Sequence, residues 1–355
     1  MNKKSYNIID FGSSKIRFSI FDNALKEIYS ATSRVVLDNE YTHHFNEIKK
    51  LIREAEKKIS FHIDEIILIY DSKELLIIDV SLNKNIQGKI QINKLHNSLF
   101  LELKQIISTN YDNLDLVHII IDKCIIDKKI YDHFPKELKK LNNIKIDFKL
   151  ICYPKKNNLK IKEKFNNNNL NVLNIFSTTY SKTLLYTSKI NSKNISFLEI
   201  GWEKTSLLIY QTNRLKFFYT IPIGSFHITK DISKIFKINI DEAEEIKKLF
   251  NSSEDEFSYQ NNLHKNPIIM RHLMEKKISV TILKKVILFR VQEIINLTFK
   301  KSNIISYNIN LEDHELFLIG DGSKLFHNNL FYLEDKFKFK SINFYEEKNF
   351  EICNS

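Results

Sequence analysis

The chain has 355 residues, of which 43% are hydrophobic, and its net charge is +11. This length exceeds the roughly 250–300 residues at which one hydrophobic core usually stops growing, so we expect two domains. The abundance of Phe and Tyr excludes a disordered chain. Because the basic residues are spread along the sequence, we attribute the charge to a Lys-rich composition and expect no nucleic-acid binding.

The three cysteines are Cys124, Cys152 and Cys353, and no two of them form a CxxC pair. This spacing indicates neither a disulfide framework nor a zinc site. The first apolar run is interrupted by Asp10, so the N-terminus does not resemble a signal peptide. We therefore expect a cytoplasmic protein.

In chain order, the first predicted elements are two strands flanking the turn of "IIDFGSSKIRFSIFD", residues 8–22, followed by an extended segment at 26–33. Residues 64–71, 115–123 and 145–153 are apolar runs typical of strands, and 96–108 favours a helix. The most apolar long stretch, 278–299, contains four charged residues, too many for a membrane span. Its periodicity predicts a long amphipathic helix.

The stretch "FLEIGWEKTSLLIYQTN", residues 197–213, repeats the opening hairpin without a gap, at an offset of 189 residues. Asp10 aligns with Glu199, and Gly12 aligns with Gly201. A single hairpin of this kind is common. Two of them at domain spacing predict two related domains.

Five of the six glycines lie at the ends of predicted strands. They are Gly12, Gly201, Gly224, Gly320 and Gly322. In a chain with so little glycine, we expect these positions to need a positive φ or a close approach of a ligand. Tight turns alone are the alternative explanation.

These motifs occur in order from residue 6 to about 345 and resemble the superfamily of actin, sugar kinases and Hsp70. Within it, the chain is most similar to the FtsA family, bacterial cell-division proteins that link FtsZ filaments to the membrane. The resemblance implies an α/β, actin-like fold with two ribonuclease-H-like domains around a nucleotide cleft. It also implies an inserted SHS2 subdomain, called 1C.

The resemblance divides the chain into the subdomains 1A, 1C, 2A and 2B. Subdomain 1A would comprise 1–70 and 149–195, and the inserted 1C would comprise 71–148. Subdomain 2A would comprise 196–238 and 306–355, the latter including the C-terminal tail, and 2B would comprise 239–305.

The resemblance implies that the chain binds ATP with Mg²⁺. Asp10 would hold Mg²⁺ through water molecules, because this ion keeps much of its hydration shell. Gly12, Ser13 and Ser14 offer amide and hydroxyl donors, and Lys15 offers a positive charge to the phosphates. The simpler interpretation is that Asp10 caps a turn and that Lys15 is solvated.

The second phosphate loop, in which Glu199, Gly201 and Trp202 are the implied nucleotide contacts, departs from the family pattern. Glu199 and Gly201 are followed by Trp202 and Glu203, where the family has glycines. A carboxylate beside the γ-phosphate costs ~1 kcal/mol or more in a partly solvated site. We therefore expect a nucleotide-binding scaffold, at most a slow ATPase, with no catalytic residue assigned.

The remaining implied nucleotide contacts lie further along the second domain. Glu244 and Lys247 match the ribose-side residues of the family, although their i, i+3 spacing is equally that of an ordinary surface ion pair. The adenosine loop would consist of Gly320, Asp321, Gly322 and Ser323.

The implied partners are the FtsZ C-terminal tail, further copies of the chain in a filament, and other division proteins through 1C. Lys284, Lys285 and Arg290 are candidate contacts for the acidic tail, with a solvated helix face as the alternative. FtsA usually ends in an amphipathic membrane helix, a pattern that residues 344–355 lack. Attachment by the usual helix is therefore in doubt, and two alternatives are open: the basic charge substitutes weakly at the anionic inner membrane surface, or the sequence is a shortened one.

The expected location is the cytoplasmic face of the inner membrane at the division site. One alternative is an actin-like cytoplasmic component of a pilus or secretion machine, which shares the fold and the insertion. A small-molecule kinase is a further alternative, which Trp202 and Glu203 disfavour.

Overall fold

The computed structural model describes residues 5–35, 41–85, 92–131, 134, 143–251, 267, 271, 274–276, 278–300, 309–326, 333–334 and 336–345. The predicted C-terminal tail beyond 345, Cys353 and parts of the predicted 2B subdomain lie outside the described residues. The chain forms two compact units, one with most residues up to Ile190 and one with most residues from Asn191 onward.

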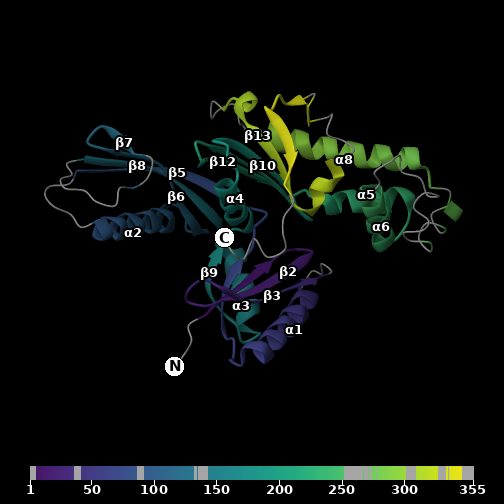
Figure 1. Cartoon of the computed structure of the whole chain (residues 1–355), viewed down its shortest axis with the longest axis horizontal. Helices are drawn as coiled ribbons and strands as arrows, with labels where there is room; N and C mark the ends of the chain where they lie inside the picture. Colours follow the sequence, from purple (N-terminus) through teal and green to yellow (C-terminus); the bar gives the residue numbers. More distant parts are fainter. Residues whose placement is uncertain are drawn as a thin grey trace. The chain divides into compact units, whose positions relative to one another are not determined.

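The first unit contains a five-stranded sheet with the order β3-β2-β1-β4-β9 (Figure 1). Its strands are β1 (Tyr6–Phe11), β2 (Lys15–Phe21), β3 (Glu27–Arg34), β4 (Glu65–Ile69) and β9 (Asn171–Phe176). The accompanying helices are α1 (Thr42–Ile59), α3 (Lys155–Asn166) and α4 (Thr178–Lys189). This arrangement places α4 directly after the C-terminal end of β9.

A four-stranded sheet is inserted in the first unit between β4 and α3, with the order β5-β8-β6-β7. It consists of β5 (Leu76–Asn85), β6 (Leu114–Ile126), β7 (Lys129–Tyr131), β8 (Asn143–Pro154) and the helix α2 (Ile92–Asn110). Leu95, Leu99 and Leu103 of α2 pack into one core with Ile146 and Phe148 of β8. The element lies where the 1C insertion is expected, and its identity as SHS2 stays a prediction.

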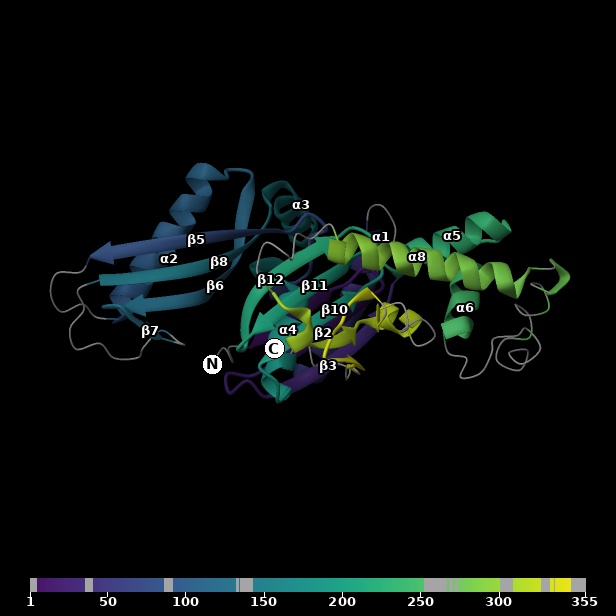
Figure 2. The same cartoon turned by 90° about the horizontal axis from the view of Figure 1, so that it is seen from above.

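The second unit repeats the sheet of the first, with the order β12-β11-β10-β13-β14. Its strands are β10 (Asn194–Ile200), β11 (Thr205–Gln211), β12 (Arg214–Ile221), β13 (Glu315–Ile319) and β14 (Ser341–Phe344). The helices are α5 (Ser225–Phe236), α6 (Ile240–Asn251) and α8 (Val280–Lys300), with a 3₁₀-helix η3 (Asp321–Phe326). The predicted long helix is α8, which packs against α5 and β11 (Figure 2).

The strand registers confirm the internal repeat. Asp10 lies opposite Arg17 in the first hairpin, and Glu199 lies opposite Ser206 in the second, so the 189-residue offset applies to both strands. The turns close in the same way: the Gly12 N–H donates to the Lys15 carbonyl at 3.1 Å, and Gly201 donates to Lys204 at 2.9 Å. The two sheets therefore share connectivity, register and turn geometry.

Most glycines of the second unit lie where another part of the chain approaches so closely that a Cβ would not fit. Gly320 is the one described glycine with a positive φ, 84°, and a Cβ built there would lie 2.7 Å from the Ile200 carbonyl. A Cβ on Gly322 would lie 2.6 Å from the Ile200 side chain. These two positions let η3 turn closely over the end of β10.

We predict that Gly320→Ala lowers the free energy of unfolding of the second unit by about 1–3 kcal/mol, because a side chain is strained at this φ and meets a carbonyl. Gly201→Ala is the matched control, since its Cβ would lie 3.2 Å from the nearest backbone atom. Urea unfolding measures both. An equal loss in the two variants would contradict this explanation.

Candidate functional site

The first hairpin ends in a buried ion pair. Asp10, at the end of β1, is 1% exposed, and its Oδ2 accepts a hydrogen bond from Arg17 Nη1 at 2.7 Å. Thr178 Oγ1, at the start of α4, donates to Oδ1 at 3.1 Å. Burial raises the pKa of Asp10, while the charges of Arg17 and Lys182 oppose that shift. Both oxygens of the predicted Mg²⁺ residue are thus engaged within the unit.

The turn of the first hairpin uses part of the donor set that we expected for phosphate. The Gly12 amide donates to Lys15, so it is not directed at a ligand in this arrangement. The Ser14 carbonyl accepts the Val35 N–H at 3.0 Å, and His44 Nε2 lies 3.2 Å from the Gly12 carbonyl. Ser13, Ser14 and Lys15 have half-buried side chains at this turn, and their hydroxyl and ammonium groups are of a kind that binds phosphate.

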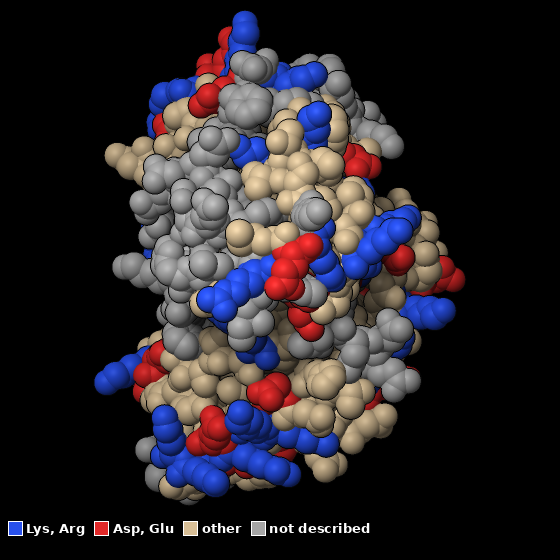
Figure 3. All heavy atoms as spheres, turned by 90° about the vertical axis from the view of Figure 1, so that its right-hand side faces the viewer, with Lys and Arg blue, Asp and Glu red and all other residues tan. Residues whose placement is uncertain are grey.

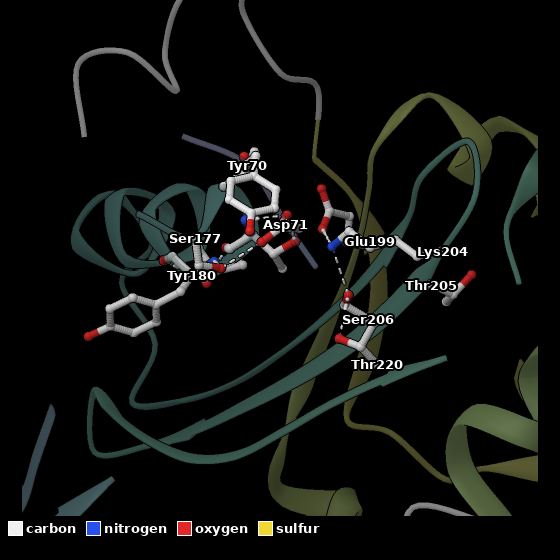
Figure 4. Close-up of polar contacts among 12 residues, drawn as sticks. Tyr70, Asp71, Ser177, Tyr180, Glu199, Lys204, Thr205, Ser206 and Thr220 are labelled. Carbon is white, nitrogen blue, oxygen red and sulfur yellow. Dashed lines mark hydrogen bonds and ion pairs between the residues drawn. The ribbon is translucent and has the colours of Figure 1, made fainter. Parts of the chain in front are cut away.

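A second carboxylate, Asp71, joins the inserted sheet to the start of α4 (Figure 4). Its Oδ1 accepts hydrogen bonds from Ser177 Oγ at 2.7 Å and from Tyr153 OH at 3.1 Å. Its Oδ2 accepts from the amide and the hydroxyl of Thr179, at 3.0 and 2.8 Å. A carboxylate at a helix N-terminus stabilises the helix through its unsatisfied amides and its dipole.

Asp71 is not among the site residues predicted from the sequence. The signal was present, because Asp71 ends an apolar strand just as Asp10 does. Thr178 donates to Asp10 while the neighbouring Ser177 and Thr179 donate to Asp71, so two strand-end carboxylates orient the first turn of α4.

His118 of β6 completes this junction. Its Nε2 accepts the backbone N–H of Ser177 at 2.8 Å, and its ring contacts Phe176 and Tyr180. Burial lowers the pKa of His118 to about 4, although the charge of Asp71 works against this. The imidazole is therefore neutral at pH 7, as its role of acceptor requires.

The second hairpin carries its own strand-end ion pair. Lys204 Nζ lies 3.6 Å from Glu199 Oε2 and donates to Ser206 Oγ at 3.2 Å (Figure 4). Ser206 in turn hydrogen-bonds Thr220 of β12 at 3.0 Å. In the first hairpin the cation comes from the position opposite the acid, whereas here it comes from the turn.

The second loop is docked on the N-terminus of α5. The amides of Ser225 and Phe226 donate to the carbonyls of Gly201 and Trp202, at 2.9 and 2.8 Å. Gly224 makes this approach possible, because a Cβ there would lie 2.6 Å from the Gly201 carbonyl. Amides at a helix N-terminus are common phosphate donors, and in this arrangement the loop carbonyls use two of them.

Trp202 is packed between α5 and α6. Its ring stacks on Phe226 with centroids 4.8 Å apart, and Lys247 Nζ lies 5.0 Å from the indole centroid, a cation–π contact. Lys247 is 3% exposed and donates to Glu244 at 2.6 Å and Thr229 at 2.9 Å. Burial lowers the pKa of Lys247, and Glu244 opposes that shift.

Three residues that we predicted as nucleotide contacts, Trp202, Glu244 and Lys247, are thus brought together by the structure. They are engaged with one another and with α5. Lys247 and Glu244 are not the surface ion pair that we considered, because Lys247 is buried and Glu244 is half-buried.

The predicted adenosine loop lies over the end of β10. Gly320 and Gly322 approach Ile200, and the Ser323 amide donates to the Gly320 carbonyl at 3.0 Å. Ser323 is buried. Residues 199–204 and 320–323, more than 100 positions apart in the sequence, therefore form one neighbourhood in the second unit.

The predicted partner residues on α8 differ in their environments. Arg290 forms a bidentate pair with Asp231 of α5, at 2.7 and 3.0 Å, and also contacts Glu293 at 2.6 Å. This pairing gives Arg290 a role in fastening α8 to α5. Lys285 is exposed and Lys284 is half-buried.

The residues fit the expected MgATP only in part. The hydroxyls and the lysine at the tip of the first turn suit a phosphate, but Trp202 and its contacts fill the side of the second loop. Within the described part of the chain, no group of three or more His, Cys, Asp or Glu side chains could hold a metal ion. Also within that part, no helix is long and apolar enough to cross a membrane.

The family model "Cell division protein FtsA" matches residues 197–332 of this chain. The Cell division protein FtsA of Helicobacter pylori is 28% identical over 99 residues, which is 27% of this chain and 20% of that protein. The chain is thus similar to FtsA over the second hairpin, α5, α6, α8 and η3. The match spans only about a fifth of the length of the curated relative.

Among solved structures, one titled "PilM-PilN type IV pilus biogenesis complex" matches with a TM-score of 0.59 and 12% identity, over 99% of this chain and 90% of that one. MreB5 of Spiroplasma citri bound to ADP matches with a TM-score of 0.42 and 10% identity, over 99% and 94%. The chain has an α/β, actin-like ATPase fold, as the sequence analysis predicted.

We predict that Trp202→Gly binds ATP with Mg²⁺ about tenfold more tightly than the natural chain, because it removes the indole from the loop and releases Lys247. Trp202→Phe is the matched control, since a phenyl ring preserves the stack on Phe226. Isothermal titration calorimetry gives both dissociation constants. Equal affinities of the two variants would show that the indole does not obstruct binding.

We also predict that acid destabilises the first unit through His118. Its folded pKa lies below the unfolded value of 6.5, so the unfolded state takes up the proton first and stability falls as pH decreases through this range. The loss from pH 7 to pH 5 is on the order of 2 kcal/mol.

Urea unfolding at the two pH values measures this loss. His118→Gln, which keeps an acceptor but does not titrate, should reduce the pH-dependent loss, whereas His43→Gln on the exposed side of α1 should leave it unchanged. If His118→Gln lost as much stability between pH 7 and pH 5 as the natural chain, the lowered pKa of His118 would not be the cause of the acid destabilisation.

Proposed function

We propose that this chain is an FtsA-like scaffold that links FtsZ to the membrane or to other division proteins. The observation that carries the proposal is the FtsA match over 197–332, which includes the second hairpin and the helices α5, α6 and α8 as one ordered set. The actin-like fold of the whole chain supports it. The place of action would be the cytoplasmic face of the inner membrane at the division site.

Nucleotide binding in this proposal is weak and serves assembly. Ser13, Ser14 and Lys15 would receive phosphate, and Asp10 would orient hydrated Mg²⁺ once its contact with Arg17 loosens. The self-engaged cluster around Trp202 supports at most a slow ATPase, because a preorganised hydrolytic site needs donors aimed at the phosphates. ATP would favour self-association by binding the assembly-competent state more tightly.

The FtsZ tail would bind on α8. Lys285 is exposed there, and Ile282 and Phe289 are exposed large apolar side chains on the same helix at i−3 and i+4. A basic residue flanked by two apolar ones suits a short acidic peptide that also has apolar anchors. Lys284 lies beside this surface, whereas Arg290 would support it from within. Other division proteins would bind the inserted sheet, the predicted 1C.

A second candidate is an actin-like component of a pilus assembly machine. The similarity to the PilM-PilN complex supports it, because that match covers nearly all of both chains at a TM-score of 0.59. In this alternative the partner would be a PilN-type protein in place of FtsZ.

We predict that a labelled FtsZ C-terminal tail peptide binds the full chain in a fluorescence anisotropy titration, and that Lys285→Glu weakens binding at least threefold by charge repulsion. Lys234→Glu, an exposed lysine of α5, is the matched control. A PilN-derived peptide is titrated in parallel. Binding of that peptide alone would replace the first candidate with the second.

A further inference from the structure

The helices α1 and α3 cover the same face of the first sheet, although about 100 residues separate them in the sequence. The ring of Phe11 in β1 contacts both Phe45 of α1, at 6.0 Å, and Phe165 of α3, at 5.7 Å. The two helices also contact each other through Phe45 and Phe165, at 5.0 Å. Their exposed sides therefore point away from the sheet on the same side of the unit.

These two helices hold more than half of the net charge of the chain. The α1 segment contains five basic and three acidic residues, and α3 contains five and one, which together give +6 of the total +11. The basic residues are dispersed in the sequence, but folding brings those of α1 and α3 to one side of the unit. Composition alone therefore does not explain the charge.

The charge is ordered along α1. Lys49, Lys50, Arg53 and Lys57 line one shallow surface hollow together with Asn46 and Glu54. From Asn46 to Lys57 this stripe runs for roughly 17 Å along the helix. Figure 3 shows Lys and Arg atoms gathered over α1 at its lower edge.

The acidic residues of α1 do not neutralise the stripe equally. Glu47 accepts a hydrogen bond from Ser33 at 2.6 Å, and the same oxygen lies 3.9 Å from Lys50 Nζ, so Glu47 pairs at long range with one lysine of the stripe. Glu56 accepts a hydrogen bond from the Ile63 amide at 2.9 Å and is directed at a neighbouring segment. Glu54 is the one acidic residue of α1 that lines the hollow, against four cations.

We propose that the outer face of α1 and α3 binds an anionic phospholipid surface. Lysines 155, 156 and 160 of α3 are exposed and would extend the contact. Each Lys or Arg close to an anionic bilayer contributes about fivefold to partitioning, the equivalent of ~1 kcal/mol. Several such residues on one face are enough for salt-sensitive membrane binding without a spanning segment.

The shape and composition of this face favour a lipid surface over a peptide or a nucleic acid. The hollow is lined by side chains of a single helix, so no second wall holds a peptide. In α1 and α3, which the structure describes in full, Leu159 is the one exposed large apolar side chain. A single-stranded nucleic acid would need exposed aromatic rings on which its bases stack, and this face has none. A charged bilayer needs only the positive charge, without shape complementarity.

The proposal rests on the membrane attachment in the proposed function and names the face that makes it, and its test needs neither nucleotide nor FtsZ, so its failure is distinguishable from failure of the FtsZ-binding experiment. The test is co-sedimentation of the full chain with vesicles of phosphatidylcholine containing 30% phosphatidylglycerol, and with pure phosphatidylcholine. We expect binding to the anionic vesicles only, with strong weakening between 50 and 300 mM salt, because exposed charges are screened.

The decisive variant is Lys50→Glu, Arg53→Glu, Lys57→Glu, which should lower the vesicle partition coefficient about a hundredfold or more. The matched control is Lys104→Glu, Lys129→Glu, Lys145→Glu, which makes the same charge change at exposed lysines of the inserted element. Circular dichroism checks that both fold. Equal loss in the two variants, or binding to an acidic peptide or RNA but not to vesicles, would overturn the proposal.

Discussion

The second unit depends on the docking of residues 201–204 against the first turn of α5. The loop carbonyls take up amides that the helix would otherwise leave unsatisfied, and unsatisfied amides are costly when buried. Gly224 and Gly320 are required because the backbones approach too closely for a Cβ. The concentration of glycine around this loop thus has one cause, which is packing of the chain on itself.

The two units share connectivity and register but have diverged in what surrounds the strand-end acid. In the first unit, Asp10 and Asp71 orient the start of α4, and the hairpin tip retains serines and a lysine. In the second, Trp202 and Lys247 fill the corresponding side of the loop with a hydrophobic and cationic stack. The first hairpin tip therefore presents hydroxyl and ammonium groups, while the second loop is a packed structural element.

Much of the fold could be predicted because its signals are local. Alternating apolar residues, an acid at the strand end and a turn glycine lie within 15 residues of one another, so the repeated hairpin is visible in the sequence. The cluster around Asp71 could not be predicted in this way, because its members lie up to 108 positions apart. The basic face of α1 and α3 was missed for the same reason, and the contacts of Trp202 depend on the placement of α6.

The stack around Trp202 also makes the intrinsic fluorescence of the protein sensitive to the state of this loop. It contains the single tryptophan of the chain, and the indole lies between a phenyl ring and a buried ammonium group. Indole emission responds to nearby charge and to solvent, so any rearrangement of this loop changes the intrinsic fluorescence of the whole molecule. The state of the second unit can thus be followed in solution without a label.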